Sequence, residues 1–268
     1  MKRDGHIHSP HCPHGSSDSF VQYIEKAISS QFTDITFTEH APLPKNFVDP
    51  TPQQDSGMHL DQLLPYFEEL QCLKKQYAQD IRIRIGLEVD YIIGFEQETR
   101  QFLDTYGHFL DDAILSVHFL QWQDTYTCID FSPENFIDFS QQVGSVEQVY
   151  HLYYDTVLQS IKADLGLYKP KRIGHPSLIH KFQLAHGKQI NDTMRIQEVL
   201  DAIKQAGYEL DFNSAGLSKK YCQESYPPLS FMKYCQAIEL PYVFGSDAHT
   251  ADDLHQHYHV LLPQSITP

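Results

Sequence analysis

The sequence predicts one α/β domain, spanning residues 1–268, in which seven parallel strands alternate with helices and close into a TIM-like barrel. Three observations favour this fold. Strand-like and helix-like runs alternate about seven times; 41% of the residues are hydrophobic, enough to bury one large core; and no internal repeat or low-complexity linker divides the chain. Strands separated by helices pair in parallel, and a parallel sheet of this length closes most economically as a barrel.

The strands are predicted from short runs rich in apolar and β-branched residues. The first is the stretch DGHIH at 4–8, and six longer runs follow at 34–40, 81–91, 112–118, 171–177, 208–214 and 241–249. A proline-rich polar segment, 41–58, follows the second run. We expect it to be a long loop over the C-terminal face of the barrel, not a domain boundary.

The helices are predicted from apolar residues that recur at helical spacing between these runs. The clearest begins at Ser145, which forms a capping-box pattern with Gln148, and ends at Gly166. A second runs from Asp192 to Gly207. Weaker periodicity predicts further helices at 18–29, 60–79, 95–105 and 228–238.

Charge and cysteine usage exclude several classes of protein. The chain has 20 Lys and Arg against 35 Asp and Glu, a formal charge of −15 that repels polyanions, so no nucleic-acid partner is expected. No apolar run is long enough to span a bilayer or to form a signal-peptide core. The five cysteines form no C-x-x-C pair and indicate reduced thiols. We therefore expect a cytoplasmic protein with no membrane contact, and predict no oligomeric state.

Metal-binding side chains end six of the seven predicted strands. They are His6 and His8, His40, Glu88, His118, His175, and Asp247 with His249. Because the C-terminal ends of barrel strands meet at one face, these residues are expected to lie together. Imidazole and carboxylate are ligands of Zn, Mn and Fe, and Glu88 and Asp247 are the candidates for bridging two ions. The sequence therefore predicts a metal site at the C-terminal ends of the strands.

Each histidine alone has another interpretation. A single residue such as His118 is more often a buried, hydrogen-bonded side chain than a ligand, and an H-x-H pair also arises by chance. Their coincidence at successive strand ends favours the metal site. The alternating residues His255, His257 and His259 indicate a strand face or a solvated tail instead.

These residues lie in motifs that resemble a known superfamily. DGHIHSPHCPHG, FTEHAP, GLEVDY, SVH, GHPS and GSDAH resemble the polymerase and histidinol phosphatase (PHP) superfamily of metal-dependent phosphoesterases, over nearly the whole chain. TEHAP, GLEVDYI, LDFNSAGL and CQESYPP are similar to its histidinol-phosphate phosphatase branch. The resemblance implies a distorted (β/α)7 barrel with three divalent ions (Zn, Fe or Mn). It also implies hydrolysis of L-histidinol phosphate to L-histidinol and phosphate, in histidine biosynthesis.

The resemblance further implies ligands for each ion. The first ion matches His6 and His8 with Glu88 and Asp247; the second matches Glu88, His118 and His175; the third matches His14, His40 and His249. His11 competes with His14 for the last set, and the spacing to CPHG favours His14.

The expected chemistry follows from such ions. A phosphate monoester repels hydroxide, and closely spaced divalent ions neutralise that charge and lower the pKa of a bound water. The metal-bound hydroxide is the predicted nucleophile, so no side chain is assigned that role. Guanidinium groups grip phosphate oxygens, which makes Arg172 and Arg195 the predicted substrate contacts. Alternatively, Arg195 faces solvent and Lys219 or Lys220 contacts the phosphate.

Other residues and other functions are also compatible with the pattern. Asp211, Asn213 and Glu39 are candidates for orienting the ligands or contacting the substrate amine. Another small phosphate ester or a nucleic acid is an alternative substrate, although the acidic charge disfavours a polynucleotide. A non-catalytic metal-binding module is a further alternative, but such a module does not need bridging carboxylates.

Overall fold

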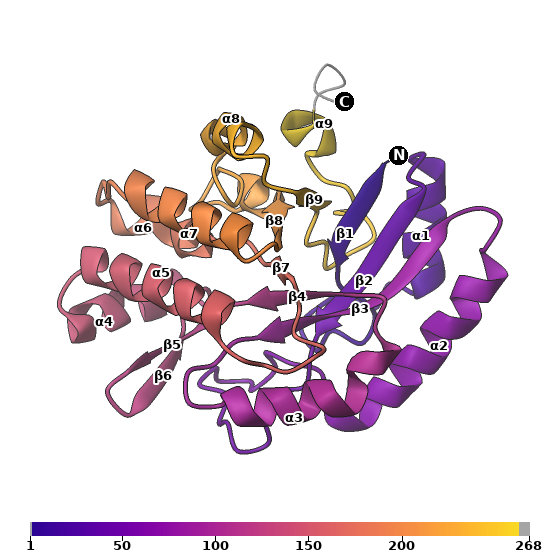
Figure 1. Cartoon of the computed structure of the whole chain (residues 1–268), viewed down its shortest axis with the longest axis horizontal. Helices are drawn as coiled ribbons and strands as arrows, with labels where there is room; N and C mark the ends of the chain where they lie inside the picture. The colour runs from indigo at the N-terminus through magenta and orange to yellow at the C-terminus, as the bar shows by residue number, and fades with distance from the viewer. Residues whose placement is uncertain (1, 263–268) are drawn as a thin grey trace.

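A computed structural model describes residues 2–262 of the chain, in which seven parallel strands curve into a nearly closed barrel surrounded by helices (Figure 1). The barrel strands, in spatial order, are β1 (Arg3–Ile7), β2 (Asp34–His40), β3 (Arg82–Asp90), β4 (Asp112–Ser116), β7 (Arg172–Ile173), β8 (Glu209–Asn213) and β9 (Tyr242–Gly245). The predicted (β/α)7 barrel is confirmed.

The first and last strands meet to bring the barrel close to closure. Ile7 and Ala248 form a parallel bridge, and the His8 N–H donates to the Ala248 carbonyl oxygen at 3.0 Å. The Asp247 N–H donates to the His6 carbonyl at 2.8 Å. Strands β1 and β9 therefore lie beside each other, as Figure 1 shows, and the segments that follow them reach the same end of the barrel.

The helices lie outside the strands, and all of them except the short α6 contain buried residues. They are α1 (Phe20–Ser29), α2 (Leu63–Gln76), α3 (Glu96–Tyr106), α4 (Pro133–Val143), α5 (Val146–Lys162), α6 (Gln183–His186), α7 (Thr193–Gln205), α8 (Met232–Ala237) and α9 (Tyr258–Leu261). In α5 the Ser145 hydroxyl caps the first turn by accepting from the Gln148 N–H at 3.2 Å, and apolar side chains at helical spacing, among them Val149, Tyr153 and Val157, are buried. The helix ends at Lys162, one turn before the predicted end at Gly166.

Two barrel strands are less than half as long as the sequence predicts. β7 has only Arg172 and Ile173 in the ladder, because the backbone leaves the strand direction at His175, where φ is 22°. β9 ends at Gly245, and Asp247 has a φ of 53°. In both cases the residues that the sequence pattern placed at the strand end turn into the mouth of the barrel.

The sequence did not predict the antiparallel hairpin of β5 (Phe119–Trp122) and β6 (Thr125–Cys128), which projects from the barrel after β4 (Figure 1). Strands of four residues are too short for a periodic signal. Helix α4 was also missed, although Ser132 caps it and Pro133 occupies its first turn. No helix within residues 2–262 is long and apolar enough to cross a membrane.

Candidate metal centre

The carboxylate of Glu88, near the end of β3, lies at the centre of the site. Five histidine nitrogens lie within 4 Å of its oxygens: those of His6 (3.3 Å), His8 (3.5 Å), His40 (3.3 Å), His118 (3.7 Å) and His175 (2.9 Å). The Ser116 hydroxyl also donates to Glu88 Oε1 at 2.6 Å. Side chains from β1, β2, β3 and the segments after β4 and β7 therefore converge on one buried carboxylate.

Asp247 supplies a second carboxylate beside the first. Its Oδ1 lies 3.1 Å from His8 Nε2, 3.7 Å from His6 Nε2 and 3.7 Å from His249 Nδ1. Gly245 leaves room beside this carboxylate for His6 and Asp211, since a Cβ there would lie 2.3 Å from Asp211 Oδ1 and 2.7 Å from His6 Cβ. Glu88 and Asp247 thus share His6 and His8, an arrangement that suits two carboxylates around adjacent cations.

Further carboxylates orient three of the histidine rings. His6 Nδ1 lies 2.8 Å from Asp211 Oδ2, and His8 Nδ1 lies 3.3 Å from Glu39 Oε1. In both rings Nε2 is left to face Glu88 and Asp247. A carboxylate on the far nitrogen is the usual support of a metal-binding histidine, because it fixes the tautomer and the ring orientation. Asp211 and Glu39 occupy the supporting positions considered from the sequence.

Asp90 supports the third ring and was missed by the sequence analysis. Its Oδ1 lies 2.8 Å from His118 Nδ1. A signal was available: Asp90 follows Glu88 by two residues in GLEVDY, and side chains two apart on a strand share a face.

The protonation states and unpartnered nitrogens of these side chains suit a bound cation. His6 Nε2 and both ring nitrogens of His40 are buried and have no hydrogen-bond partner. Burial, together with the neighbouring His8, holds the pKa of His40 well below its usual value, so this ring keeps a free lone pair. Burial alone would raise the pKa of Glu88, but His6 and His118 outweigh it and hold that pKa well below normal.

Four groups of three or four donors have their ligand atoms within 4.8 Å of one another. They are His6, His8 and Glu88; His6, His175 and Asp247; Glu88, His118 and His175; and His8, Cys12, His40 and His249. The first group belongs to the set expected for the first ion, and the third group is the set expected for the second ion. The second group combines residues from both sets. The fourth keeps His40 and His249 of the third set but has His8 and Cys12 where the sequence predicts His14.

His14 lies at the edge of the site and His11 lies away from it. The ring of His14 is 5.0 Å from that of His40 and 5.2 Å from that of His249, and its Nδ1 donates to the Asp55 carbonyl oxygen at 2.9 Å. His11 instead packs against Phe20 and Tyr66. Of the two competing histidines, the structure brings His14 to the site.

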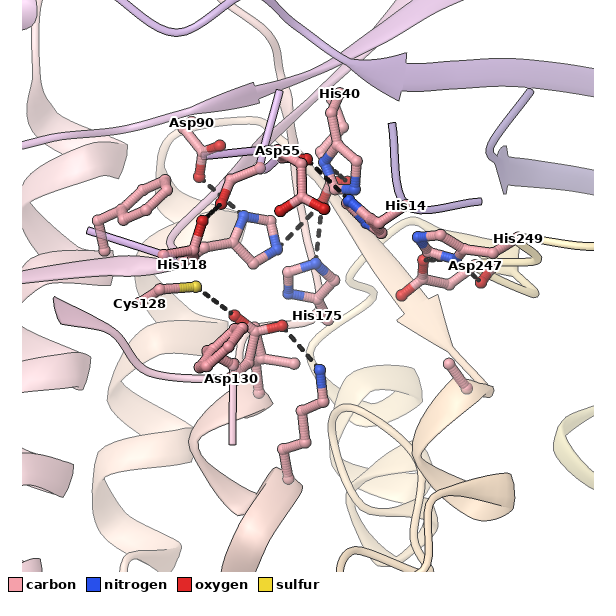
Figure 2. A pocket seen from close by; sticks show the side chains of 18 of the residues that line it. His14, His40, Asp55, Asp90, His118, Cys128, Asp130, His175, Asp247 and His249 are labelled. Atoms are coloured by element: carbon pink, nitrogen blue, oxygen red, sulfur yellow. Dashed lines mark hydrogen bonds and ion pairs between the residues drawn. The ribbon is translucent and has the colours of Figure 1, made fainter. Parts of the chain in front are cut away.

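The site opens into a cavity of about 410 Å³. Figure 2 shows His118 and His175 facing Asp130 across it, with His14, His40, Asp247 and His249 on another side. The segment 51–56 of the predicted loop lines the cavity, together with Phe119 and Cys128 of the hairpin. The loop therefore lies over the C-terminal face of the barrel as expected.

Arg172 and Arg195 are not in this cavity, which corrects their assignment to the substrate. Arg172 begins β7, at the opposite end of that strand from His175, and is buried; its Nη2 donates to the Gly5 carbonyl at 2.8 Å and to Asp112 at 2.7 Å. Arg195, on α7, pairs with Asp155 and Glu198. Arg172 therefore packs inside the barrel at the end opposite the site, and Arg195 links α7 to α5 by an ion pair.

The cations that line the cavity are Lys181 and Lys219. Lys219 was an alternative in the sequence analysis, whereas Lys181 was missed. Its Nζ donates to Asp130 Oδ2 at 2.8 Å, and the Cys128 thiol donates to the other oxygen at 3.2 Å. Burial lowers the pKa of Lys181, but Asp130 outweighs it and raises that pKa above normal, so the ammonium stays charged.

The C-terminal histidine run is neither a strand face nor a solvated tail. His255 is buried, stacks on Phe32 and hydrogen-bonds Asp4 at 2.8 Å. His257 immediately precedes the short helix α9, and His259 lies within it. The expected strand is absent because both His255 and His257 have positive φ angles, which turn the backbone.

Known proteins resemble the chain over its whole length. The family described as PHP domain matches residues 4–215. The histidinol-phosphatase of Bacillus subtilis (strain 168) is 48% identical over 264 residues, which are 98% of each chain. A solved Listeria monocytogenes structure, assigned to the histidinol phosphatase hisK, has a TM-score of 0.92 at 41% identity and covers 97% of this chain and 99% of that chain.

A more distant structure shares the fold. The histidinol phosphate phosphatase (HISK) of Lactococcus lactis, complexed with Zn, L-histidinol and phosphate, has a TM-score of 0.71 at 20% identity and covers 100% of this chain and 94% of that chain. The family match over residues 4–215 and the full-length match to the Bacillus enzyme show that the chain belongs to the PHP domain family, among the histidinol-phosphatases.

Proposed function

We propose that this chain hydrolyses L-histidinol phosphate to L-histidinol and inorganic phosphate, a step of histidine biosynthesis. The observation that carries the proposal is the Glu88 carboxylate surrounded by five imidazoles at the mouth of an open cavity. The 48% identity to the Bacillus histidinol-phosphatase supports the choice of substrate.

The proposed cofactor is a set of three divalent ions, Zn, Fe or Mn. Their proposed ligands are His6, His8, Glu88 and Asp247 for the first ion, Glu88, His118 and His175 for the second, and His14, His40 and His249 for the third. Such ions, when bound, neutralise phosphate charge and activate water. The protein's part is to hold the donors in place through Asp90, Asp211 and Glu39, and to exclude bulk water from the buried carboxylates.

Lys181 is the proposed protein contact for the phosphate. A phosphate monoester carries negative charge, and a buried cation interacts with it more strongly than an exposed one. The Lys181 side chain is 23% exposed and is held at the cavity wall by Asp130. Lys219 also lines the cavity but is exposed, so its charge is screened by solvent.

We further propose that residues 1–268 form one catalytic domain that works in the cytoplasm. Ligand candidates come from both ends of the chain, which supports a single unit. The five cysteines are free thiols, as expected in a reducing compartment.

The test is phosphate release from L-histidinol phosphate by the purified protein. We expect chelator to abolish the release and Mn, Zn or Fe to restore it. Glu88→Gln should lose activity, whereas the matched control Glu68→Gln, at an exposed position on α2, should keep it. Full activity in chelator would contradict a metal mechanism, and faster hydrolysis of another phosphate ester or of single-stranded DNA would contradict the substrate.

A further inference from the structure

A thiol lies beside two histidines proposed for the third ion, His40 and His249, and beside His8, which is proposed for the first. Cys12 Sγ and one ring nitrogen each of His8, His40 and His249 all lie within 4.8 Å of one another. Cys12 is buried, with 6% of its surface exposed. The four donors come from the segment after β1, the end of β2 and the segment after β9, so the fold gathers them without any local motif.

A tight turn holds the thiol in this position. The Cys12 N–H donates to the Ser9 carbonyl oxygen at 3.0 Å, and the Gly15 N–H donates to the Cys12 carbonyl oxygen at 3.2 Å. A Cβ at residue 15 would lie 2.9 Å from Cys12 Cβ and 3.3 Å from Sγ. Glycine at this position therefore leaves the space that Cys12 occupies.

One of the neighbouring imidazoles, that of His40, has no hydrogen-bond partner. Both of its nitrogens are buried. The ring of His8 lies 4.2 Å from that of His40 and 3.9 Å from that of His249. A buried polar group normally has a partner, and a bound cation would supply the one that His40 lacks.

We infer that Cys12 is a ligand of the third ion and adds sulfur to the set that contains His40 and His249. The inference rests on the metal centre proposed above. Without a cation, burial and the Glu39 carboxylate raise the pKa of the Cys12 thiol, which stays protonated. A bound divalent ion replaces that proton: the S–H bond breaks, an S–metal bond forms, and one proton is released to solvent.

As a consequence, the ion positions should differ in their preference for Zn²⁺ over Mn²⁺. The other donor groups offer only nitrogen and oxygen. Thiolate favours Zn²⁺ over Mn²⁺, whereas carboxylate and imidazole accept both. The third position is therefore the one that retains Zn²⁺ when the protein is loaded with excess Mn²⁺.

The test uses the full chain loaded with Co²⁺, whose bond to a thiolate gives a charge-transfer absorption band in the near ultraviolet. We expect this band in the wild-type protein and in Cys235→Ser, which replaces another buried cysteine, on α8, outside the donor groups. We expect Cys12→Ser to lack the band and to bind one metal equivalent at least about tenfold more weakly, the lower bound for loss of a supporting partner.

X-ray absorption at the zinc edge of the wild-type protein gives a second readout that needs no variant. One zinc should show a sulfur neighbour at about 2.3 Å. A fully Co²⁺-loaded protein without the band, a zinc spectrum without sulfur, or a band that survives in Cys12→Ser would overturn the inference. Phosphate release is measured separately: its absence with the band intact counts against the proposed substrate and not against Cys12.

Discussion

Asp90 shows how one side chain tunes the donor set, because its carboxylate directs His118 Nε2 toward Glu88. Asp90→Asn removes the charge that supports this ring, and we expect metal affinity to fall by about 10- to 100-fold. Competition with a chelating indicator measures the affinity. The control is Asp104→Asn, an exposed acid on α3. Equal affinity in the two variants would mean that Asp90 has no supporting role.

Lys181 should matter for the phosphate and little for the metal. Lys181→Met keeps the aliphatic stem but removes the charge, and we expect the inhibition constant of inorganic phosphate to rise about tenfold, the size of one hydrogen bond to a charged group. Lys188→Met, at an exposed position nearby, is the matched control. An unchanged inhibition constant, at unchanged metal content, would assign the phosphate contact to another group.

Arg172 should matter for folding and little for substrate. Its guanidinium pairs with Asp112 beneath the site, and Arg3 pairs with the same carboxylate. Removing one partner of a buried ion pair costs about 3–5 kcal/mol when the other charge is left unpaired, but here Asp112 keeps Arg3. We expect Arg172→Met to lose free energy of unfolding in urea, by less than about 3 kcal/mol, with an unchanged KM in the folded protein. A raised KM at full stability would restore Arg172 as a substrate contact.

Among the elements, the short helical turn at Leu178–Phe182 is fastened to its neighbours by one buried imidazole. His180 Nε2 lies 2.7 Å from Asp192, at the start of α7, and His180 Nδ1 bonds Glu224 in the loop after β8. The Tyr154 hydroxyl of α5 donates to Asp192, and the Tyr150 ring stacks on His180. This network fixes the turn that carries Lys181.

The network predicts a loss of stability at alkaline pH. Burial lowers the pKa of His180, but Asp192 and Glu224 outweigh it and raise that pKa to about 9. Protonation therefore stabilises the fold fully below the unfolded-state pKa of about 6.5, and the contribution, roughly 3 kcal/mol, is lost as pH rises through about 9.

Urea unfolding of wild type and His180→Gln between pH 6.5 and 10 measures this contribution. The difference in stability between the two proteins should shrink as the pH rises. Other titrating groups are common to both proteins and cancel in the difference. A constant difference across the range would mean that the imidazole is not protonated in the folded state.

The elements with strong local signals could be predicted from the sequence. The cap at Ser145 and the apolar stripe of α5 located that helix, and β2 matches its predicted range of 34–40. The hairpin after β4 could not be found, because two strands of four residues carry too few alternations. The predicted range of β7 was too long because the motif GHPS continues the apolar run in sequence. The turn at His175, which ends the strand, depends on tertiary contacts with the site.

On the scale of the whole molecule, metal binding should stabilise the fold. The site holds Glu88, Asp247 and six of the histidines in a small buried volume, and bound cations offset the repulsion between its carboxylates. At a free metal concentration of 100 times Kd, one site adds about 2.7 kcal/mol, and each kcal/mol raises the Tm of a chain of this size by roughly 2–4 °C. Calorimetry with and without chelator should show this drop, and an unchanged Tm would argue against a structural contribution of the ions.

The convergence of the donors was predictable because barrel geometry sends every strand end to one face, so strand positions alone grouped the candidates. The sequence did not predict which long cationic side chains reach the cavity. Arg172 lies close to the GHPS motif in sequence, yet the strand carries it to the other end of the barrel. Lys181 reaches the cavity through a short turn whose path the sequence does not encode in any periodic pattern.

The contact between His8 and Asp247 joins residues that are 239 positions apart. During translation, therefore, a nascent chain that has not yet emerged from the ribosome as far as β9 lacks the second carboxylate and His249. It can form most of the sheet and still not assemble the complete set of donors. Completion of the donor set is thereby deferred until synthesis reaches the last strand, whereas the group of Glu88, His118 and His175 needs no residue beyond the segment after β7.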